Sequence, residues 1–210
     1  MIGELRLHEA LLLLALRDQK GGFGNASLLG NGLAGAILIE LVLAGRIRIE
    51  KNKRSTVVRV VDERLTGEPI MDIWLSQMRS AKKEATVGTW LTRIAGTRKL
   101  ADRIAERLWH SGLLRREARS FLVFDYTVFV LGYPSIKQKL VDRLRRLIRE
   151  NNEPAAAESA LVAMASRSGV LSAYFDRQER RMHRTRIQQM IKAEPVVRAV
   201  MEAMASVQAG

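Results

Sequence analysis

The apolar residues of this chain recur mostly at helical spacing. Residues 8–17 predict a short helix, and residues 27–44 predict a second helix that is apolar on nearly every face and should therefore be buried. Between Ile136 and Ile148 the apolar positions follow the 3.6-residue period, and Ser135 is placed to cap that helix. The other predicted helices, in chain order, cover residues 69–82, 86–95, 97–111, 154–166, 171–193 and 195–207. The pattern therefore predicts a mainly α-helical fold.

Two shorter segments alternate polar and apolar residues, which is typical of β-hairpins. Residues 46–50 and 55–62 flank the basic turn 51–54, and residues 113–130 predict a second hairpin or extended region. No stretch has the composition of a linker. We therefore expect a single domain over residues 1–210, with a central helix bundle and small β-hairpins.

The second hairpin ends in an apolar tetrapeptide, made of Val128, Phe129, Val130 and Leu131. It is either a buried strand or an apolar tip that inserts into a membrane or contacts a second subunit. An apolar anchor beside positive charge is how soluble proteins bind anionic bilayers. The sequence alone leaves both interpretations open.

The chain is strongly basic, with a formal net charge of +13 and a pI of about 10.8. Such a balance favours polyanionic partners, which are nucleic acids, anionic lipids or acidic proteins. The positive residues concentrate in segments 51–54, 93–103, 137–149 and 177–186. The longest apolar stretch, residues 33–45, is shorter than the roughly 20 residues of a membrane-spanning helix. Because no signal or lipidation motif is visible either, we expect a cytoplasmic protein that associates with membranes peripherally.

Residues that carry catalysis are scattered or absent. His8, His110 and His183 have no metal-ligand spacing, and the chain has no cysteine, phosphate-binding loop or nucleophile elbow. The glycine-rich segment 22–27 is close to a dinucleotide fingerprint, but it follows a helix where that motif requires a strand. We interpret it as an interhelical turn whose amides face an anion at a helix N-terminus. The expected protein is non-enzymatic and has neither a metal nor a cofactor.

Nucleic acid is the alternative partner. Each predicted hairpin follows a helix and a glycine, Gly45 or Gly112, as the wing of a winged-helix protein does. A winged-helix reader, however, exposes polar residues on the helix before the wing so that they contact base edges. Residues 33–44 are almost all apolar, which makes nucleic-acid binding the less favoured interpretation.

Several segments resemble the Golgi phosphoprotein 3 family. The similarity covers almost the whole chain and is most specific in residues 32–47, an apolar helix with an internal acid that ends in Gly-Arg; the other segments are 11–18, 90–91, 113–114, 121–125 and 136–140. The resemblance implies a single, mostly helical domain that binds phosphatidylinositol 4-phosphate on the cytosolic face of Golgi membranes. It also implies an adaptor that retains glycosyltransferases as protein clients, with an apolar hairpin that assists membrane insertion and self-association.

The family's headgroup pocket is only partly conserved in this chain. Of its two basic positions near a later helix start, one is Arg98 and the other is Ala101. Its helix arginine corresponds to Ala34, and its loop tryptophan corresponds to Asn25, close to Phe23. Each lost arginine removes a charge-assisted contact of roughly 1.5–3 kcal/mol.

Neighbouring residues offer a substitute pocket. The resemblance, together with the nearby basic residues, gives the expected headgroup residues Phe23, Asn25, Arg98, Lys99 and Arg103, and Lys20 is a further cation beside them. The family's hairpin corresponds to residues 121–133, where the apolar character is kept. With a reduced pocket and a net charge of +13, we expect broad binding of anionic lipid more than selectivity for one phosphoinositide.

Overall fold

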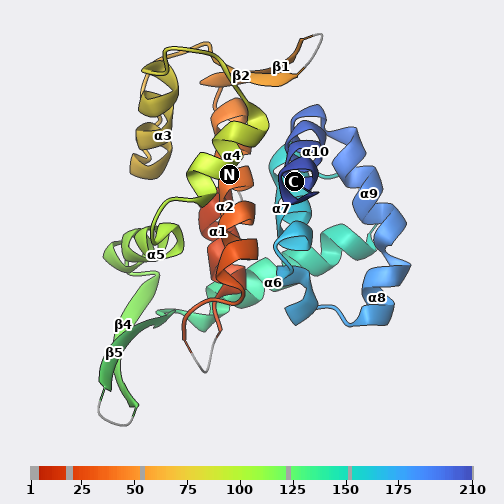
Figure 1. Ribbon diagram of the computed structural model, residues 1–210. Helices are drawn as coiled ribbons and strands as arrows, with labels where there is room; N and C mark the ends of the chain where they lie inside the picture. Colours follow the sequence, from red (N-terminus) through yellow and green to blue (C-terminus); the bar gives the residue numbers. More distant parts are fainter. Residues whose placement is uncertain (1–4, 18–20, 53–54, 122–123, 151–152, 210) are drawn as a thin grey trace.

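The computed structural model describes residues 5–17, 21–52, 55–121, 124–150 and 153–209 (Figure 1). These residues form ten α-helices and two small antiparallel sheets, which confirms the mainly helical class. The helices are α1 (Leu7–Ala15), α2 (Ala26–Leu43), α3 (Pro69–Arg79), α4 (Val87–Ala95), α5 (Leu100–His110), α6 (Pro134–Arg149), α7 (Ala156–Arg167), α8 (Arg177–Met182), α9 (Arg184–Ala193) and α10 (Pro195–Ala209). A short 3-10 turn, η1 (Val170–Ala173), lies between α7 and α8.

Helix α2 lies at the centre of the fold. It packs against α1, α4, α7 and α10, and these helices surround it in Figure 1. Its residues 32–41 are buried in one continuous hydrophobic cluster. In the described part of the chain, α2 alone has the length and composition of a membrane span, with 18 residues and a mean hydropathy of 1.8. Because 61% of that stretch is buried among the other helices, α2 has the surroundings of a core helix.

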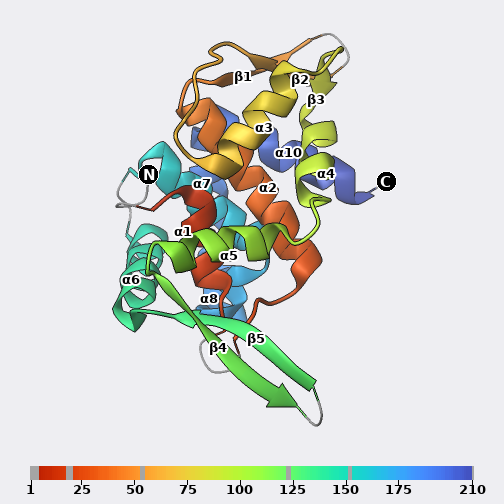
Figure 2. The ribbon, with the colours of Figure 1, turned by 90° about the vertical axis from the view of Figure 1, so that its left-hand side faces the viewer.

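The strands form two separate hairpins, as the alternating pattern predicted. Strands β1 (Ile47–Lys51) and β2 (Thr56–Val60) are antiparallel, and β2 also pairs with the two-residue strand β3 (Ala85–Thr86), which the sequence did not predict. Strands β4 (Leu114–Phe121) and β5 (Phe124–Leu131) form a longer hairpin that projects from the helical body below α5 (Figure 2). Gly45 and Gly112, with φ of +68° and +77°, end the preceding helices and turn the chain into each hairpin.

Two helix predictions are wrong. The single helix expected over residues 171–193 is divided into η1, α8 and α9. The break has a local cause, because the Asp176 side chain accepts a hydrogen bond from the Glu179 backbone N–H and so starts a new helix at Arg177. Ser135 does not cap α6 either, because that helix begins at Pro134 and Ser135 lies within its first turn. The fixed φ of Pro134 suits this position.

The apolar tetrapeptide 128–131 lies at the base of the β4–β5 hairpin, so its description as a tip is wrong. Leu131 pairs with Leu114 beside the helical body, whereas the turn of the hairpin follows the Phe121–Phe124 pair. Val130 is buried, and Phe129 is half-buried against the core. Val128 packs closely against Gly21, which lies between α1 and α2. A Cβ atom added at Gly21 would lie only 2.7 Å from the Cβ of Val128. These contacts make the tetrapeptide part of the packing that anchors the hairpin.

Charged side chains are buried where α1, α2, α3 and α5 meet. Glu40 of α2 caps α1 by accepting a hydrogen bond from the backbone N–H of Leu7 at 2.7 Å, and it also bonds to the ring Nδ1 of His8. Glu68 caps α3, and Arg107 Nε lies 3.1 Å from its carboxylate. His8 Nε2 lies 3.9 Å from the same carboxylate, so the cluster links four helices through polar contacts.

Candidate anion-binding site

The N-terminus of helix α2 and the N-terminus of helix α5 lie close together. Helix α2 starts at Ala26, after the glycine-rich turn in which Gly21 and Gly22 both have positive φ. Helix α5 starts at Leu100, after Lys99, which adopts a left-handed backbone conformation with φ of +58°. Residues from both helix starts line the same cavity, so the positive ends of both helix dipoles lie near one place.

A cavity of about 440 Å³ lies between these two helix starts. The α2 side of its wall includes Phe23, Gly24 and Ser27, and the α5 side includes Lys99 and Asp102. Backbone amides at helix N-termini attract anions, and the Lys99 ammonium adds a full positive charge. The Asp102 carboxylate opposes them, so the cavity favours an anion only moderately.

The structure brings together some of the expected headgroup residues and not others. Phe23 and Lys99 line the cavity, which confirms their proximity. Arg98 and Arg103 are exposed beside Lys99 but are not part of the cavity wall. Asn25 is the N-cap of α2, and its side-chain oxygen accepts a hydrogen bond from the backbone N–H of Leu28 at 3.1 Å. Lys20 lies outside the described residues.

Of the three positions that depart from the family pattern, Ala101 and Ala34 differ in their surroundings. Ala101 lines the cavity, so a longer basic side chain there would reach into it. Ala34 is fully buried in the core, with 0% of its surface exposed. Sequence reasoning missed the contribution of Ser27, Thr97 and Asp102 to the wall. The sequence does show that these polar residues lie at predicted helix starts. Polar residues at such positions usually serve only as helix caps, so they did not indicate a cavity wall.

The four basic segments do not gather on one face. The segment around Lys99 lies at the start of α5, while the arginines of 177–186 lie on α8 and α9, across the central helices from α5 (Figure 1). Arginines of segment 137–149 are paired with carboxylates, as Arg143 is with Glu158 at 2.6 Å and Arg149 with Glu179 at 2.9 Å. Within segment 51–54, residues 53 and 54 lie outside the described part of the chain. Much of the positive charge is therefore spread over the surface.

The role of Asn25 as a cap leads to a stability prediction. Asn25→Ala should lower the free energy of unfolding by about 1 kcal/mol, because the Leu28 N–H loses its acceptor. Urea denaturation measures this loss. Asn25→Ser keeps a capping oxygen and should remain close to the parent protein, so equal stability of all three proteins would contradict the capping role.

The sequence model of the family described as Golgi phosphoprotein 3 (GPP34) matches residues 7–207. Vacuolar protein sorting-associated protein 74 of Schizosaccharomyces pombe (strain 972 / ATCC 24843) is 32% identical over 179 residues, which are 73% of this chain and 52% of that protein. The chain therefore spans about half the length of this curated relative. Since the family match extends over nearly all of its length, this chain belongs to the Golgi phosphoprotein 3 family.

Proposed function

We propose that this protein is a peripheral, non-enzymatic membrane adaptor that binds anionic phospholipid headgroups in the cavity between the starts of α2 and α5. The observation that carries the proposal is that residues from two helix N-termini, Lys99 among them, line one cavity. Phosphate groups suit such a place, because the amides donate hydrogen bonds and the dipoles favour negative charge. Family membership adds the expectation that phosphatidylinositol 4-phosphate is among the lipids bound.

The composition of the wall supports broad lipid binding. Among the described residues of the wall, Lys99 is the one that carries a positive charge, and Asp102 partly offsets it. Selective capture of a phosphomonoester would need further fixed cations, but Ala101 supplies none, and Arg98 lies outside the wall. Arg98 and Arg103 are exposed near the cavity, where they attract any anionic surface through long-range, salt-sensitive charge interactions.

The rest of the expected role belongs to the same proposal. It comprises one domain over residues 1–210, a position on the cytosolic face of a membrane, Golgi in a eukaryote, protein clients and self-association. Nucleic acid is the weaker partner, because the helix before the β1–β2 hairpin is buried from residue 32 to 41 and offers little polar surface to base edges.

Sedimentation with vesicles tests the lipid preference. At equal vesicle charge, phosphatidylserine and phosphatidylinositol 4-phosphate vesicles should bind this protein to a similar extent, and Arg98→Ala should leave their ratio unchanged. A strong preference for phosphatidylinositol 4-phosphate that Arg98→Ala abolishes would contradict broad binding. Binding of random duplex DNA in preference to both vesicles would contradict the membrane role.

A further inference from the structure

A further cavity, of about 470 Å³, lies between the end of α1, the first turn of α2 and the η1 turn. It shares Gly24 and Leu29 with the cavity at the starts of α2 and α5, so the two cavities adjoin at the first turn of α2. Neither Lys99 nor Asp102 lines it, and the rest of its wall comes from other parts of the chain. The ligand that suits this cavity can therefore be inferred from its own wall.

Much of the wall is apolar and already in place. Its aliphatic side chains are those of Leu14, Ala15, Leu16, Leu28, Leu29, Val170 and Ala173. Leu14, Leu16 and Leu29 are each only 2% exposed, so the core behind them fixes their positions. Gly24 faces open space, because a Cβ atom added there would meet no other atom within 4 Å. The cavity is thus a preformed apolar space, as small-molecule sites usually are.

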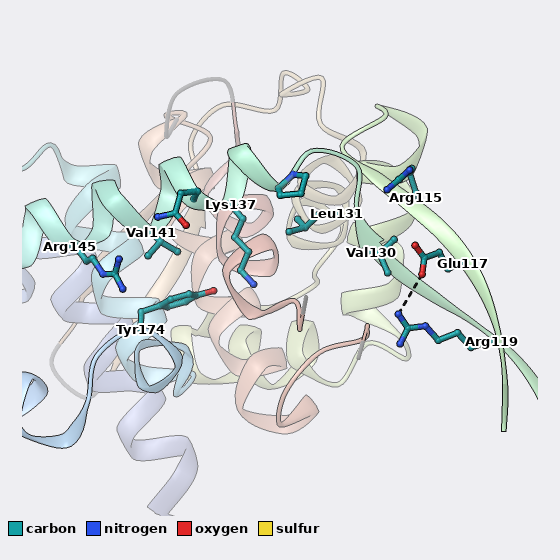
Figure 3. Close-up of a pocket in the computed structure, with 11 residues that line it drawn as sticks. Arg115, Glu117, Arg119, Val130, Leu131, Lys137, Val141, Arg145 and Tyr174 are labelled. Carbon is teal, nitrogen blue, oxygen red and sulfur yellow. Dashed lines mark hydrogen bonds and ion pairs between the residues drawn. The ribbon is translucent and has the colours of Figure 1, made fainter. Parts of the chain in front are cut away.

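Two long polar side chains of the wall are bound to the end of α1. Lys137 Nζ donates a hydrogen bond to the backbone carbonyl of Leu16 at 2.6 Å. The Tyr174 hydroxyl donates to the carbonyl of Leu14, and Figure 3 shows Lys137 and Tyr174 beside each other. Both side chains therefore close off carbonyl groups that the end of a helix leaves without a partner.

The shorter polar side chains of the wall also have partners within the protein. Ser168 Oγ donates to the carbonyl of Met164 at 2.7 Å, and Ser172 Oγ donates to the carbonyl of Gly169 at 2.6 Å. Asn25 uses its side-chain oxygen to cap α2. Because these groups are already hydrogen-bonded, the wall offers a ligand mainly apolar surface.

The exposed edge of the wall is positively charged. Arg17, which follows α1, is exposed, and the described residues of the wall include no aspartate or glutamate. Lys137 is only 7% exposed, so between these two cations it is Arg17 that solvent and a ligand can reach. An apolar chain that ends in an anion matches both the interior and the edge, because its charge stays outside the apolar space.

We propose that this cavity binds a single acyl chain with an anionic end. The chain would lie against Leu14, Leu29 and Val170, and the anion would lie at the edge, beside Arg17. The proposal does not depend on headgroup binding in the adjoining cavity, because Lys99 is not part of this wall.

The test is an amide chemical-shift titration of the isotope-labelled full chain with decanoate, below its critical micelle concentration. Saturable shifts should cluster on residues 14–17, 28–29 and 168–174. Residues 168–174 are decisive, because they do not line the adjoining cavity. Shifts that do not saturate, or that leave residues 168–174 unchanged, would overturn the site.

Two variants separate the apolar part of the site from the charged part. Ala173→Phe should weaken decanoate binding by at least about tenfold, because the ring takes up space in the cavity. Arg17→Gln should weaken it by about two- to fivefold, as the loss of one exposed charge contact does, and should leave the binding of neutral decanol unchanged. Both residues are exposed, so both variants should fold, and thermal unfolding checks this.

The matched controls are Ala205→Phe and Arg198→Gln on α10. They make the same exchanges at exposed positions outside the cavity wall, so both should keep the decanoate affinity of the parent protein. Losses as large in the controls as in the cavity variants would show detergent-like binding to the surface and would overturn the site. An equal loss of decanol and decanoate binding in Arg17→Gln would overturn the assigned position of the anion.

A final comparison distinguishes the two sources of such a chain, which are a free fatty acid and a single-chain phospholipid. Decanoate represents the first, and decanoyl lysophosphatidic acid represents the second. The ligand that binds more tightly, and whose binding Ala173→Phe weakens, identifies the source. If Ala173→Phe weakens the binding of neither ligand, the proposal fails.

Discussion

Replacing Glu40 with alanine is expected to lower the free energy of unfolding by about 2–4 kcal/mol, because each buried hydrogen-bonding group that loses its partner costs roughly 1–3 kcal/mol. Glu40 is 7% exposed and accepts hydrogen bonds from the α1 backbone and from the His8 ring. Without it, the Leu7 N–H and a histidine with no exposed surface lose their partner in the core. Urea denaturation followed by circular dichroism measures the loss.

The matched control for this prediction is Glu202→Ala. Glu202 lies exposed on α10, so its removal should change stability by no more than about 0.5 kcal/mol. A loss below about 1 kcal/mol for Glu40→Ala would show that the buried cluster contributes little to holding α1 against α2.

Placing arginine at Ala101 is expected to strengthen binding to phosphatidylinositol 4-phosphate vesicles by about tenfold or more, as one added charge-assisted contact would. Ala101 lines the cavity in the first turn of α5, beside Lys99, so a guanidinium there would reach the same space. The gain in affinity should be larger for phosphatidylinositol 4-phosphate than for phosphatidylserine vesicles of equal charge. The planar guanidinium donates two hydrogen bonds in a fixed geometry, which favours the more exposed phosphomonoester.

Gln77→Arg is the control for added charge. Gln77 lies exposed on α3 and is not part of the cavity wall, so it adds the same positive charge without reaching a headgroup there. It should raise binding to both vesicle types slightly and equally. If Ala101→Arg behaved like Gln77→Arg, the cavity would not be where the headgroup lies.

Much of the fold could be predicted because its signals are local. The buried helix α2 followed from an apolar run closed by a glycine, and both hairpins followed from alternation after such a glycine. The two-residue strand β3 could not be predicted, because its pairing with Val57 and Val58 depends on tertiary contact. The helix break at Asp176 had a local signal in its capping side chain, but the helical period beyond it hid that signal.

The candidate site was predicted less completely than the fold. Phe23 and Lys99 could be assigned to one region because the family pattern brought distant segments together. The orientation of Arg98, the capping bond of Asn25 and the burial of Ala34 depend on packing that no spacing in the sequence encodes. The position of the tetrapeptide 128–131 could not be predicted for a similar reason. Apolar strand residues form the same sequence pattern at the tip and at the base of a hairpin.

The most direct test of the headgroup site compares Lys99→Glu with Lys82→Glu in binding to anionic vesicles. Both substitutions reverse the charge of one exposed lysine, but of the two only Lys99 lines the cavity at the starts of α2 and α5. Lys99→Glu should weaken vesicle binding by about tenfold or more, as the loss of one charge-assisted contact to a phosphate would, while Lys82→Glu should weaken it only slightly. Equal losses in the two variants would contradict a headgroup site in this cavity and would leave net charge as the basis of membrane binding.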